Sequence, residues 1–471
     1  MRTRFAPSPT GYMHLGNLRS ALFEYLLARR LGGAFVLRIE DTDQERLVDD
    51  AVEKIYKTLD TVGIICDEGP HVGGEYGSYV QSQRKSGYIE YAKQLVDSGH
   101  AYYCFCDKNR LAGLEEGYDR HCHKLDKADI TENLARNIPY VVRQLIPSGH
   151  TTFVDEVFGE ITVDNAELED QILIKSDGMP TYNFANVVDD HLMAITHVMR
   201  GSEYLSSTPK YNLLYQALGW DIPTYVHLPL ILNKDGGKLS KRRGDASFED
   251  LLAMGFLPEA IVNYIALLGW SPPDNREIYS LDELCTTFST EGISKSPSVF
   301  DITKLRWFNG EYLKAMEPET FFKLAESHVR GAVKKESADI KTLAALVQGR
   351  ISTLDEIAEM LDFIDILPEY DTSLFVHKKS KCDEIIAADV LSKIIPRLAE
   401  IDENDWTGSE LYAFMTNFAQ ETEIKSSQVL WPMRVALSGK PATPGGASDL
   451  LVILGKEESL RRINIALEKL S

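Results

Sequence analysis

The sequence predicts an α/β protein in which a parallel-sheet domain is interrupted by an α+β insertion and followed by an all-helical C-terminal part. Three observations carry this prediction. Strand and helix patterns alternate over residues 1–80, which is typical of a parallel sheet with helices on its faces. The alternation is lost over 81–180 and returns at 181. From about residue 247 onward, apolar residues recur at the spacing of amphipathic helices.

The spacing of apolar residues predicts the helices and strands one by one along the chain. The first four alternate strand, helix, strand and helix, at Thr3–Ala6, Leu18–Leu31, Ala34–Ile39 and Asp49–Val62. The next region mixes a helix at Tyr88–Asp97 with short strands that include T-T-F-V-D and G-E-I-T-V. Apolar runs then predict two strands, a helix and a strand, at Ile172–Lys175, Leu192–Met199, Ser207–Leu218 and Val226–Leu232. Helices follow at Asp250–Met254, Pro258–Gly269 and Ser280–Phe288, and helices fill most of the remaining chain.

Length and composition limit the function classes. A chain of 471 residues exceeds one ordinary core, so about two to four domains are expected. No apolar run approaches the ~18 residues of a membrane helix or forms a signal-peptide core, so no membrane partner is expected and the cytoplasm is the expected location. Six cysteines exclude a disulfide scaffold, and the net charge of −21 argues mildly against nucleic acid unless a local motif overrules it.

The first motif follows the first predicted strand and has the sequence R-F-A-P-S-P-T-G-Y-M-H-L-G-N. Proline ends the strand because it has no N–H to donate to a sheet. Gly11 and Gly16 allow a ligand to approach the backbone, and the helix that begins near Asn17 directs its free N–H groups to the same place. His14 can donate to a phosphate oxygen there. The motif predicts an anion site at a strand end; the alternative is a proline-rich turn with a solvated histidine.

The second motif, K-L-S-K-R-R, begins at Lys238 in a glycine-rich loop after a predicted strand. Lysines on such a loop can close over a triphosphate and neutralise the charge that develops on a leaving pyrophosphate. The spacing is not that of a P-loop. Taken alone, the motif is better explained as a solvated basic turn.

Taken together, the two motifs resemble the paired signatures of class I aminoacyl-tRNA synthetases, here His14-Leu15-Gly16-Asn17 and K-L-S-K-R. The longer strings R-F-A-P-S-P-T-G, R-I-E-D-T-D and D-G-M-P-T-Y-N-F-A-N-V-V-D-D-H are similar to those of bacterial glutamyl-tRNA synthetases, and the resemblance covers essentially the whole chain. Asn17 and Leu239 depart from the commonest signature residues, as is usual in this branch.

The resemblance implies a Rossmann-type catalytic domain with a parallel sheet, an inserted α+β domain that binds the tRNA acceptor end, and an all-helical anticodon-binding part. The implied division has five segments: the first catalytic half at 1–80, the insertion at 81–180, the second catalytic half at 181–245, a helical stem-contact domain at 246–318 and the anticodon-binding domain at 319–471. A monomer is the family expectation.

The implied reaction joins L-glutamate to the terminal adenosine of tRNA-Glu through a glutamyl-adenylate, and AMP and pyrophosphate are released. The implied catalytic residues are His14, Lys238 and Lys241, and those that bind ATP with Mg²⁺ are His14, Gly16, Asn17, Lys238, Ser240 and Lys241. The implied glutamate-binding residues are Arg4, Ser8, Glu40, Tyr182, Asn186 and Arg200. Arginine suits this site because its planar fork pairs a carboxylate bidentately. The alternatives are a helix-start acidic cluster for Glu40 and a surface ion pair for Arg200.

The resemblance also implies that the helical C-terminal part contacts the anticodon through Arg350, Arg434 and Thr443. For Arg350 the alternative is a solvated helix arginine. A helical C-terminal part distinguishes the chain from bacterial glutaminyl-tRNA synthetases, whose anticodon domains are β-barrels. The sequence leaves open whether tRNA-Gln is also charged.

A cysteine cluster raises the question of zinc. Cys104, Cys106 and Cys122 offer soft ligands, and His123 or His121 would have to supply a fourth, because Lys124 stands where the family places a histidine. The alternative is a loop with three reduced thiols. Residues 189–191, Asp-Asp-His, contain suitable ligand types, but as consecutive residues of a predicted strand they would point to opposite faces, which argues against a metal there.

Two further functions compete with the ligase. A tRNA-independent adenylyltransferase would have no use for the long helical C-terminal part. A non-enzymatic RNA-binding paralogue would be expected to have lost His14 or Lys241, and both are present.

Overall fold

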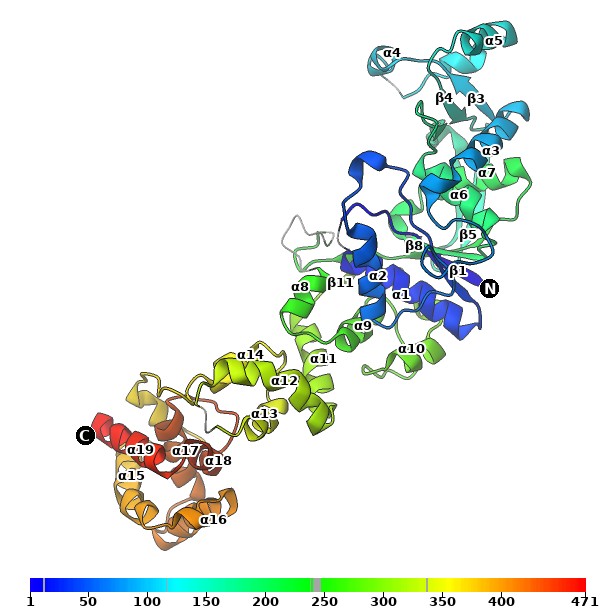
Figure 1. Cartoon of the computed structure of the whole chain (residues 1–471). Coiled ribbons are helices and arrows are strands. Elements are labelled where there is room, and N and C mark those ends of the chain that lie inside the picture. Colours follow the sequence, from blue (N-terminus) through cyan, green and yellow to red (C-terminus); the bar gives the residue numbers. More distant parts are fainter. Residues whose placement is uncertain (12, 116, 238, 240–246, 336–337) are drawn as a thin grey trace. The chain divides into compact units, whose positions relative to one another are not determined.

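The structure is a computed structural model and describes residues 1–11, 13–115, 117–237, 239, 247–335 and 338–471 (Figure 1). The chain divides into two compact units. The first comprises Met1–Leu252 with Pro258–Ile302, and the second comprises Ala253–Leu257 with Thr303–Ser471. Among the described residues, no helix is long and apolar enough to cross a membrane. The five-segment division proposed from the sequence is finer than these units and stays a prediction.

The first unit contains all the named strands, which form four small sheets. Parallel pairing joins β1 (Arg2–Phe5) to β2 (Ala34–Leu37), with Arg2 opposite Ala34 and Phe5 opposite Leu37. A second sheet has the order β6-β5-β9-β8, at Gly159–Asp164, His150–Asp155, Thr224–Leu228 and His197–Gly201. The other two sheets contain β3 (Ala101–Cys104), β4 (Val141–Gln144) and β7 (Ile172–Ile174), and β10 (Ile231–Leu232) and β11 (Ser298–Val299).

The helices of the first unit flank these strands (Figure 1). They are α1 (Leu15–Arg30), α2 (Ala51–Thr61), α3 (Lys85–Asp97), α4 (Lys108–Ala112), α5 (Lys127–Ala135), α6 (Tyr182–Leu192), α7 (Thr208–Leu218), α8 (Phe248–Ala253), whose last residue belongs to the second unit, α9 (Pro258–Ala266) and α10 (Leu281–Thr287). One apolar cluster joins α3, α6 and α7 through buried residues such as Tyr88, Phe184 and Leu214. Buried side chains line one face of α3 and of α7, which fits their amphipathic sequences, whereas α6 is buried on all sides from Phe184 to Asp190.

The arrangement of the strands brings the carboxyl ends of β1, β8 and β9 together. β1 lies beside β8, and the Thr196 amide donates to the Arg2 carbonyl at 3.0 Å. β8 pairs in parallel with β9, so that Gly201 lies opposite Leu228. β5 joins β9 by a parallel bridge between Asp155 and Tyr225. Open parallel sheets bind ligands beyond the carboxyl ends of their strands, so the ends of β1, β8 and β9 mark the place to look for a site.

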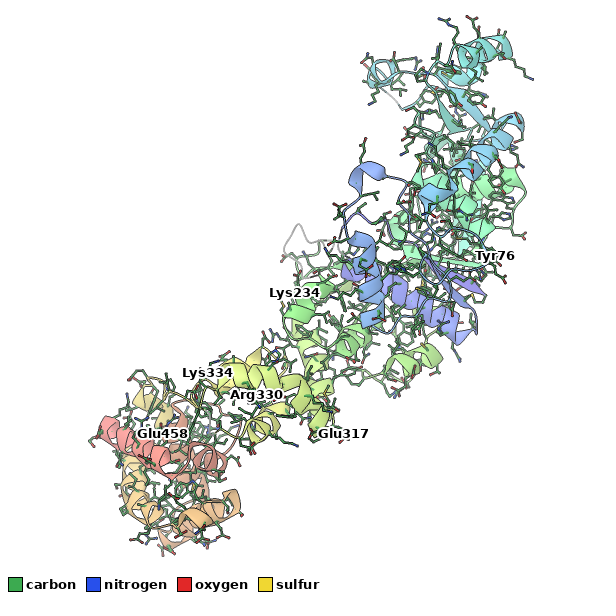
Figure 2. All side chains as sticks on the ribbon, in the orientation of Figure 1. Tyr76, Lys234, Glu317, Arg330, Lys334 and Glu458 are labelled. Carbon is green, nitrogen blue, oxygen red and sulfur yellow. The ribbon has the colours of Figure 1, made fainter. Side chains whose placement is uncertain are left out.

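The named elements of the second unit are helices. They are α11 (Ile302–Ala315), whose first residue belongs to the first unit, and α12 (Pro318–Ala332), α13 (Ile340–Gln348), α14 (Glu356–Leu361), α15 (Glu384–Ala399), α16 (Gly408–Glu421), α17 (Ser426–Ser438), α18 (Ala447–Leu454) and α19 (Lys456–Leu470). Fully buried Arg462 donates to the carbonyls of Phe363, Ile364 and Leu437 at 2.8–3.0 Å. Glu458 (Figure 2) accepts from its Nε at 2.6 Å. Arg462 thereby satisfies carbonyls that the helices leave unpaired.

The predicted elements are found with shifted ends, and two assignments are wrong. The single strand predicted at Val226–Leu232 is two strands, β9 and β10, which lie in different sheets with Pro229 between them, a residue that cannot donate to a sheet. The strand predicted at Leu192–Met199 is β8, which runs from His197 to Gly201. The residues before it, including Asp189, belong to helix α6 and not to a strand. The run V-V-D-D-H-L-M-A-I-T-H-V-M is too apolar for a single sequence to show where its helix ends and its strand begins.

Candidate active site

A cavity of about 300 Å³ lies at the carboxyl ends of β1, β8 and β9. Its wall includes seven residues to which the sequence analysis assigned ATP or glutamate: Arg4, Ser8, His14, Gly16, Asn17, Tyr182 and Arg200. These residues come from segments nearly 200 positions apart in the chain. The two sequence motifs that precede α1 and open α6 therefore meet at one cavity.

His14 forms the N-cap of α1. Its Nδ1 accepts from the Asn17 amide at 3.2 Å, which satisfies one of the N–H groups that a helix start leaves unpaired. A neutral histidine that accepts at Nδ1 carries its proton on Nε2, so Nε2 is the donor. Gly16 permits this arrangement, since a Cβ at that position would lie 3.1 Å from the His14 ring. The helix start and the His14 ring thus offer donors to an anion on the same side of the cavity.

Arg200 lies near the end of β8 and is only 7% exposed. Its carbon Cζ lies 4.6–5.4 Å from the ring centres of Tyr204, Tyr211 and Tyr225. In the described part of the chain, no ion pair joins Arg200 to a carboxylate. A buried guanidinium without a counter-charge is costly, and it favours an anionic ligand in the cavity that it lines.

Arg4 differs from Arg200 because two carboxylates of the protein already neutralise the charge of Arg4. Its Nε donates to Asp190 at 3.0 Å and its Nη1 donates to Glu24, also at 3.0 Å. All three side chains are buried. Burial alone would raise the pKa of Asp190, but Arg4 and Arg38 outweigh it and hold that pKa below its ordinary value. Arg4 therefore contributes to the cavity wall as part of an ion-pair network.

Arg38 is the centre of this network, although the sequence analysis gave it no role. It is fully buried, donates to Asp190 at 2.7 Å and donates twice to Glu40 Oε1, at 2.8 and 3.2 Å. Arg38 and Glu40 are two positions apart on an extended segment, which is the one signal in the sequence that could have linked them. Asp190 is 152 residues away, and nothing in the sequence indicates that contact.

Glu40 and Asn186 do not line the cavity, but both are buried. Among the residues that the structure describes, none is hydrogen-bonded to Glu40 Oε2 or Asn186 Nδ2. Burial raises the pKa of Glu40 to about 7 even though Arg38 opposes this shift. Buried polar atoms are rarely left unpaired in native proteins, so these two atoms indicate a ligand group that the protein alone does not supply.

Asp189 and Asp190 have protein partners and are not arranged as metal ligands. Asp189 accepts from Arg84, Gln81 and Tyr88 at 2.7–2.9 Å. The His191 ring stacks on Trp220 with ring centres 3.9 Å apart. The strand predicted for residues 189–191, whose alternation argued against a metal, was wrong, because these residues are helical.

Lys238, Ser240 and Lys241 lie outside the described residues, so their assignment to catalysis and ATP stays a prediction. Leu239, which stands between them, is described. It is buried and lines the cavity. The second motif therefore reaches the cavity at this residue.

The cysteine cluster lies at the end of β3. The sulfur atoms of Cys104, Cys106 and Cys122 all lie within 4.8 Å of one another. His123 is not part of this group; its ring lies 5.3 Å from the Tyr102 ring. The Tyr118 hydroxyl lies instead 3.2 Å from Cys104 Sγ and 3.6 Å from Cys106 Sγ. Tyr118 was not among the predicted ligands, because only histidine and cysteine were considered as ligand types.

In the second unit, Arg434 lines a separate cavity of about 280 Å³ together with Trp431 and Tyr412. Its guanidinium lies 4.5 Å from the Trp431 ring centre, and its buried Nε has no hydrogen-bond partner in the described part of the chain. Burial lowers the pKa of Arg434, and the charge of Arg350 lowers it further, which places these two arginines near each other. Thr443 is buried, and its hydroxyl donates to the Gly445 carbonyl at 2.7 Å.

Comparison with known families decides what kind of protein carries these sites. Residues 1–307 match the model of the class I tRNA synthetase (E and Q) catalytic domain, and residues 319–467 match that of an anticodon binding domain. The chain belongs to the class I tRNA synthetases. The family and the fold class predicted from the sequence are thereby confirmed.

Individual relatives match the synthetase over its full length. It is 55% identical to a curated protein of Clostridium botulinum (strain Eklund 17B / Type B) named glutamate–tRNA ligase, over 100% of this chain and 99% of that protein. A protein of the same name from Clostridium novyi (strain NT) is also 55% identical, covering 100% and 98% of the two chains.

Solved structures agree with the curated relatives. The crystal structure of a glutamate tRNA ligase from Elizabethkingia meningosepticum in complex with its amino acid has a TM-score of 0.89 and 34% identity, covering all of both chains. The glutamate-tRNA synthetase of Elizabethkingia anophelis also has a TM-score of 0.89, with 33% identity over 99% of each chain.

Proposed function

We propose that this synthetase is a glutamate–tRNA ligase that joins L-glutamate to the 3′-terminal adenosine of tRNA-Glu at the expense of ATP. The observation that carries the proposal is Arg200, a buried guanidinium in the cavity wall that pairs with no carboxylate among the described residues. A glutamate side chain would supply the missing negative charge, whereas a glutamine side chain would leave the charge uncompensated. The names of the full-length relatives support the same substrate.

The remaining polar atoms fit the other groups of the amino acid. The partnerless Glu40 Oε2 can accept from the α-ammonium group, and a bound cation favours the ionised form of Glu40, whose pKa burial raises to about 7. Asn186 Nδ2 can donate to a carboxylate oxygen. Ser8 and Tyr182 line the cavity and add hydroxyl groups. Arg4 faces the same cavity, although its charge is shared with Glu24 and Asp190.

The chemistry needs positioning and charge stabilisation but no protein nucleophile. The glutamate α-carboxylate attacks the α-phosphorus of ATP, and pyrophosphate leaves. A ribose hydroxyl of the terminal adenosine then attacks the carbonyl carbon of the adenylate, and AMP leaves. His14 Nε2 and the start of α1 would donate to the phosphates. ATP would arrive with Mg²⁺ on its phosphates, and Lys238 and Lys241 would neutralise the departing pyrophosphate.

A charging assay tests the proposed function. Purified protein is incubated with labelled glutamate, ATP and a tRNA-Glu transcript, and acid-precipitable label is measured. ATP-dependent label is expected, and it should disappear when the 3′-terminal ribose has been oxidised with periodate. Absence of label with folded protein and with native tRNA-Glu would instead favour a paralogue without ligase activity.

We also propose a structural zinc ion at the cysteine cluster, with Tyr118 in the place that the sequence analysis gave to His123. Tetrahedral zinc with bonds of about 2.3 Å to sulfur requires sulfurs about 3.8 Å apart. The cluster is close to this spacing, since Cys106 Sγ and Cys122 Sγ are 3.4 Å apart. Thiolates are the soft ligands that zinc prefers, and the Tyr118 oxygen would complete the set. The ion would fix the chain around β3.

Removal of the Tyr118 hydroxyl tests this ligand set. Metal analysis of untagged protein should give about one zinc per chain for the wild type and clearly less for Tyr118→Phe after dialysis against a weak chelator. His123→Ala is the matched control and should retain its zinc. A wild-type protein with far less than one zinc per chain would refute the site, and loss of zinc from His123→Ala but not from Tyr118→Phe would restore the original ligand assignment.

The second unit would contact the anticodon. Arg350 follows α13, is exposed and lies near enough to Arg434 for their charges to interact. Arg434 lines the cavity beside Trp431, where an RNA base could stack. Thr443 would act mainly through its backbone, because its hydroxyl is bonded to Gly445. The match of this region to an anticodon binding domain favours a tRNA substrate over a free-nucleotide adenylyltransferase.

We expect Arg350→Gln to relax discrimination against tRNA-Gln. The arginine side chain would donate to one anticodon base, and its loss should bring the kcat/KM values for tRNA-Glu and tRNA-Gln about tenfold closer. The measurement is charging of each transcript separately. The control is Arg330→Gln, which removes an exposed arginine of α12 (Figure 2). This arginine pairs with Glu326. Unchanged selectivity in Arg350→Gln would contradict the assignment.

The oligomeric state, the cellular location and the roles of two segments of the chain are also proposals. We propose that the enzyme acts as a monomer in the cytoplasm, where the tRNA pool is charged. The acceptor-binding role of 81–180 and the stem-contact role of 246–318 also stay proposals. Strands β5 and β6, which fall within 81–180, continue the sheet formed by β9 and β8. The inserted segment is therefore joined through β9 to β8, the strand that carries Arg200.

A further inference from the structure

Arg200 is held by a buried pair of residues that the proposed mechanism does not use. His227 on β9 and Asp155 at the end of β5 are both at most 1% exposed. Asp155 Oδ2 lies 2.7 Å from His227 Nδ1 and accepts the His227 backbone amide at 3.0 Å. On the other side of the ring, Arg200 Nε donates to His227 Nε2 at 3.1 Å. The three side chains form a line from Asp155 through the imidazole to the guanidinium.

The partners fix the protonation of His227. Arg200 can only donate, so His227 Nε2 must be an unprotonated acceptor. The ring proton is therefore on Nδ1, where Asp155 accepts it. The Asp155 carboxylate is fixed in this orientation, because its other oxygen, Oδ1, accepts the backbone amides of Val157 and Phe158 at 2.9 and 2.8 Å. The carboxylate thus selects the tautomer that accepts from Arg200, as carboxylates do for catalytic and metal-binding histidines.

Thr208 is a second acceptor for Arg200. Together, His227, Asp155 and Thr208 form what we call the holder of Arg200. Thr208 Oγ1 accepts from Arg200 Nη2 at 2.9 Å and donates to the Tyr204 carbonyl at 2.9 Å. Two neutral acceptors therefore fix the plane of the guanidinium without cancelling its charge. A carboxylate in the place of His227 would neutralise Arg200 and compete with an anionic substrate. Neutral acceptors keep the positive charge available to the cavity.

We propose that His227, held in one tautomer by Asp155, is a positioning residue that orients Arg200 for the substrate side-chain carboxylate. This inference rests on the proposed function, because it takes Arg200 as the group that binds this carboxylate. The contact is made to the substrate side chain and not to ATP. Loss of the holder should therefore raise KM for glutamate and leave KM for ATP unchanged.

Two substitutions of His227 separate positioning from packing. His227→Asn places its amide near the former Nδ1, so it retains a partner for Asp155 but loses the acceptor that faces Arg200. His227→Gln is longer and can present its oxygen near the former Nε2. We expect His227→Asn to raise KM for glutamate about tenfold, with kcat and KM for ATP within about twofold, and His227→Gln to restore most of the loss. The readout is aminoacylation with varied glutamate or varied ATP.

Asp155→Asn gives an independent test. Both Asp155 oxygens face N–H groups, so the amide NH₂ of asparagine must oppose a donor or force the ring into the other tautomer. The same selective rise in KM for glutamate is expected. Equal rises in KM for glutamate and ATP, or a His227→Gln variant as impaired as His227→Asn, would overturn the inference. If His227→Asn does not fold, Asp155→Asn with the same readouts decides it.

A third variant distinguishes failure of this inference from failure of the proposed function. Arg200→Gln should raise KM for glutamate more than any variant of His227. A large effect of Arg200→Gln with no effect of His227→Asn would overturn the positioning role alone. An unchanged KM for glutamate in Arg200→Gln would overturn the role of Arg200 and, with it, the inference. The double variant Arg200→Gln, His227→Asn should show no loss beyond Arg200→Gln, since the holder then has nothing to orient.

Discussion

Replacing Arg38 with methionine should lower the free energy of unfolding of the first unit by about 3–5 kcal/mol. Arg38 is completely buried and donates to Glu40 and Asp190. Methionine fills a similar volume but leaves the Glu40 carboxylate buried without a counter-charge. Differential scanning calorimetry of the full chain should show the transition of this unit about 5–10 °C lower. KM for glutamate should rise as well, because Glu40 loses the partner that fixes its orientation.

The matched control removes an exposed arginine of the same unit. Arg136 pairs with Glu132 at 3.2 Å, and both side chains are about two thirds exposed. Arg136→Met should change the unfolding free energy by less than about 1 kcal/mol. If Arg38→Met fails to express, Arg38→Lys should still show a lower Tm, because lysine cannot make both contacts. A Tm for Arg38→Met equal to that of Arg136→Met would contradict the account of the network.

Replacing Arg200 with glutamine should strongly lower kcat/KM for glutamate and should change stability little. The loss of a charge-assisted bond to the substrate carboxylate should lower kcat/KM for glutamate about 10²–10³-fold. Stability should change by no more than about 1 kcal/mol, because no described residue forms an ion pair with the buried Arg200 and its removal relieves a desolvation cost. Steady-state charging and calorimetry on the same preparation measure both quantities.

Leu214→Ala provides a stability control for Arg200→Gln. Leu214 is fully buried in the apolar cluster of the same unit, and its truncation should cost about 2–5 kcal/mol. Its Tm should fall while KM for glutamate stays near the wild-type value. A strong drop in Tm for Arg200→Gln with an unchanged glutamate KM would mean that Arg200 is a structural residue.

The contrast between the two arginines explains how the site is built. Arg38 stabilises the protein because its charge is matched by Glu40 and Asp190. Arg200 stabilises little because its partners, His227 and Thr208, are neutral. An active site commonly retains such an unfavourable group when the substrate supplies the missing partner. Within one unit, Arg38, whose charge is matched by carboxylates, thus serves folding. Arg200, whose charge is not matched, serves substrate binding.

The local features of the site could be predicted from the sequence. The proline-rich turn, Gly16 and the start of α1 were expected to form an anion site, and the structure places His14 at the helix N-cap. These features depend on residues close together in the chain, where turn and helix-capping rules apply. The all-helical second unit was also predictable, because its apolar spacing is regular.

The buried polar contacts could not be predicted in the same way. Asp190 was considered as a metal ligand, yet its partners are Arg4 and Arg38, 186 and 152 residues away. His227 and Asp155 were not noticed at all, since they meet only when β9 pairs with β5. One sequence contains no information on which distant charges meet. Burial decides their roles, and burial follows from the tertiary fold.

The central claim is that an unmatched buried arginine selects a carboxylate side chain. Its most direct test is the ratio of kcat/KM for glutamate and glutamine in the charging of tRNA-Glu by the wild-type enzyme. Glutamine has nearly the same shape but no charge, so the account predicts a preference for glutamate of about 10³-fold or more. A ratio within about tenfold would contradict it, because Arg200 would then be making no use of the substrate charge.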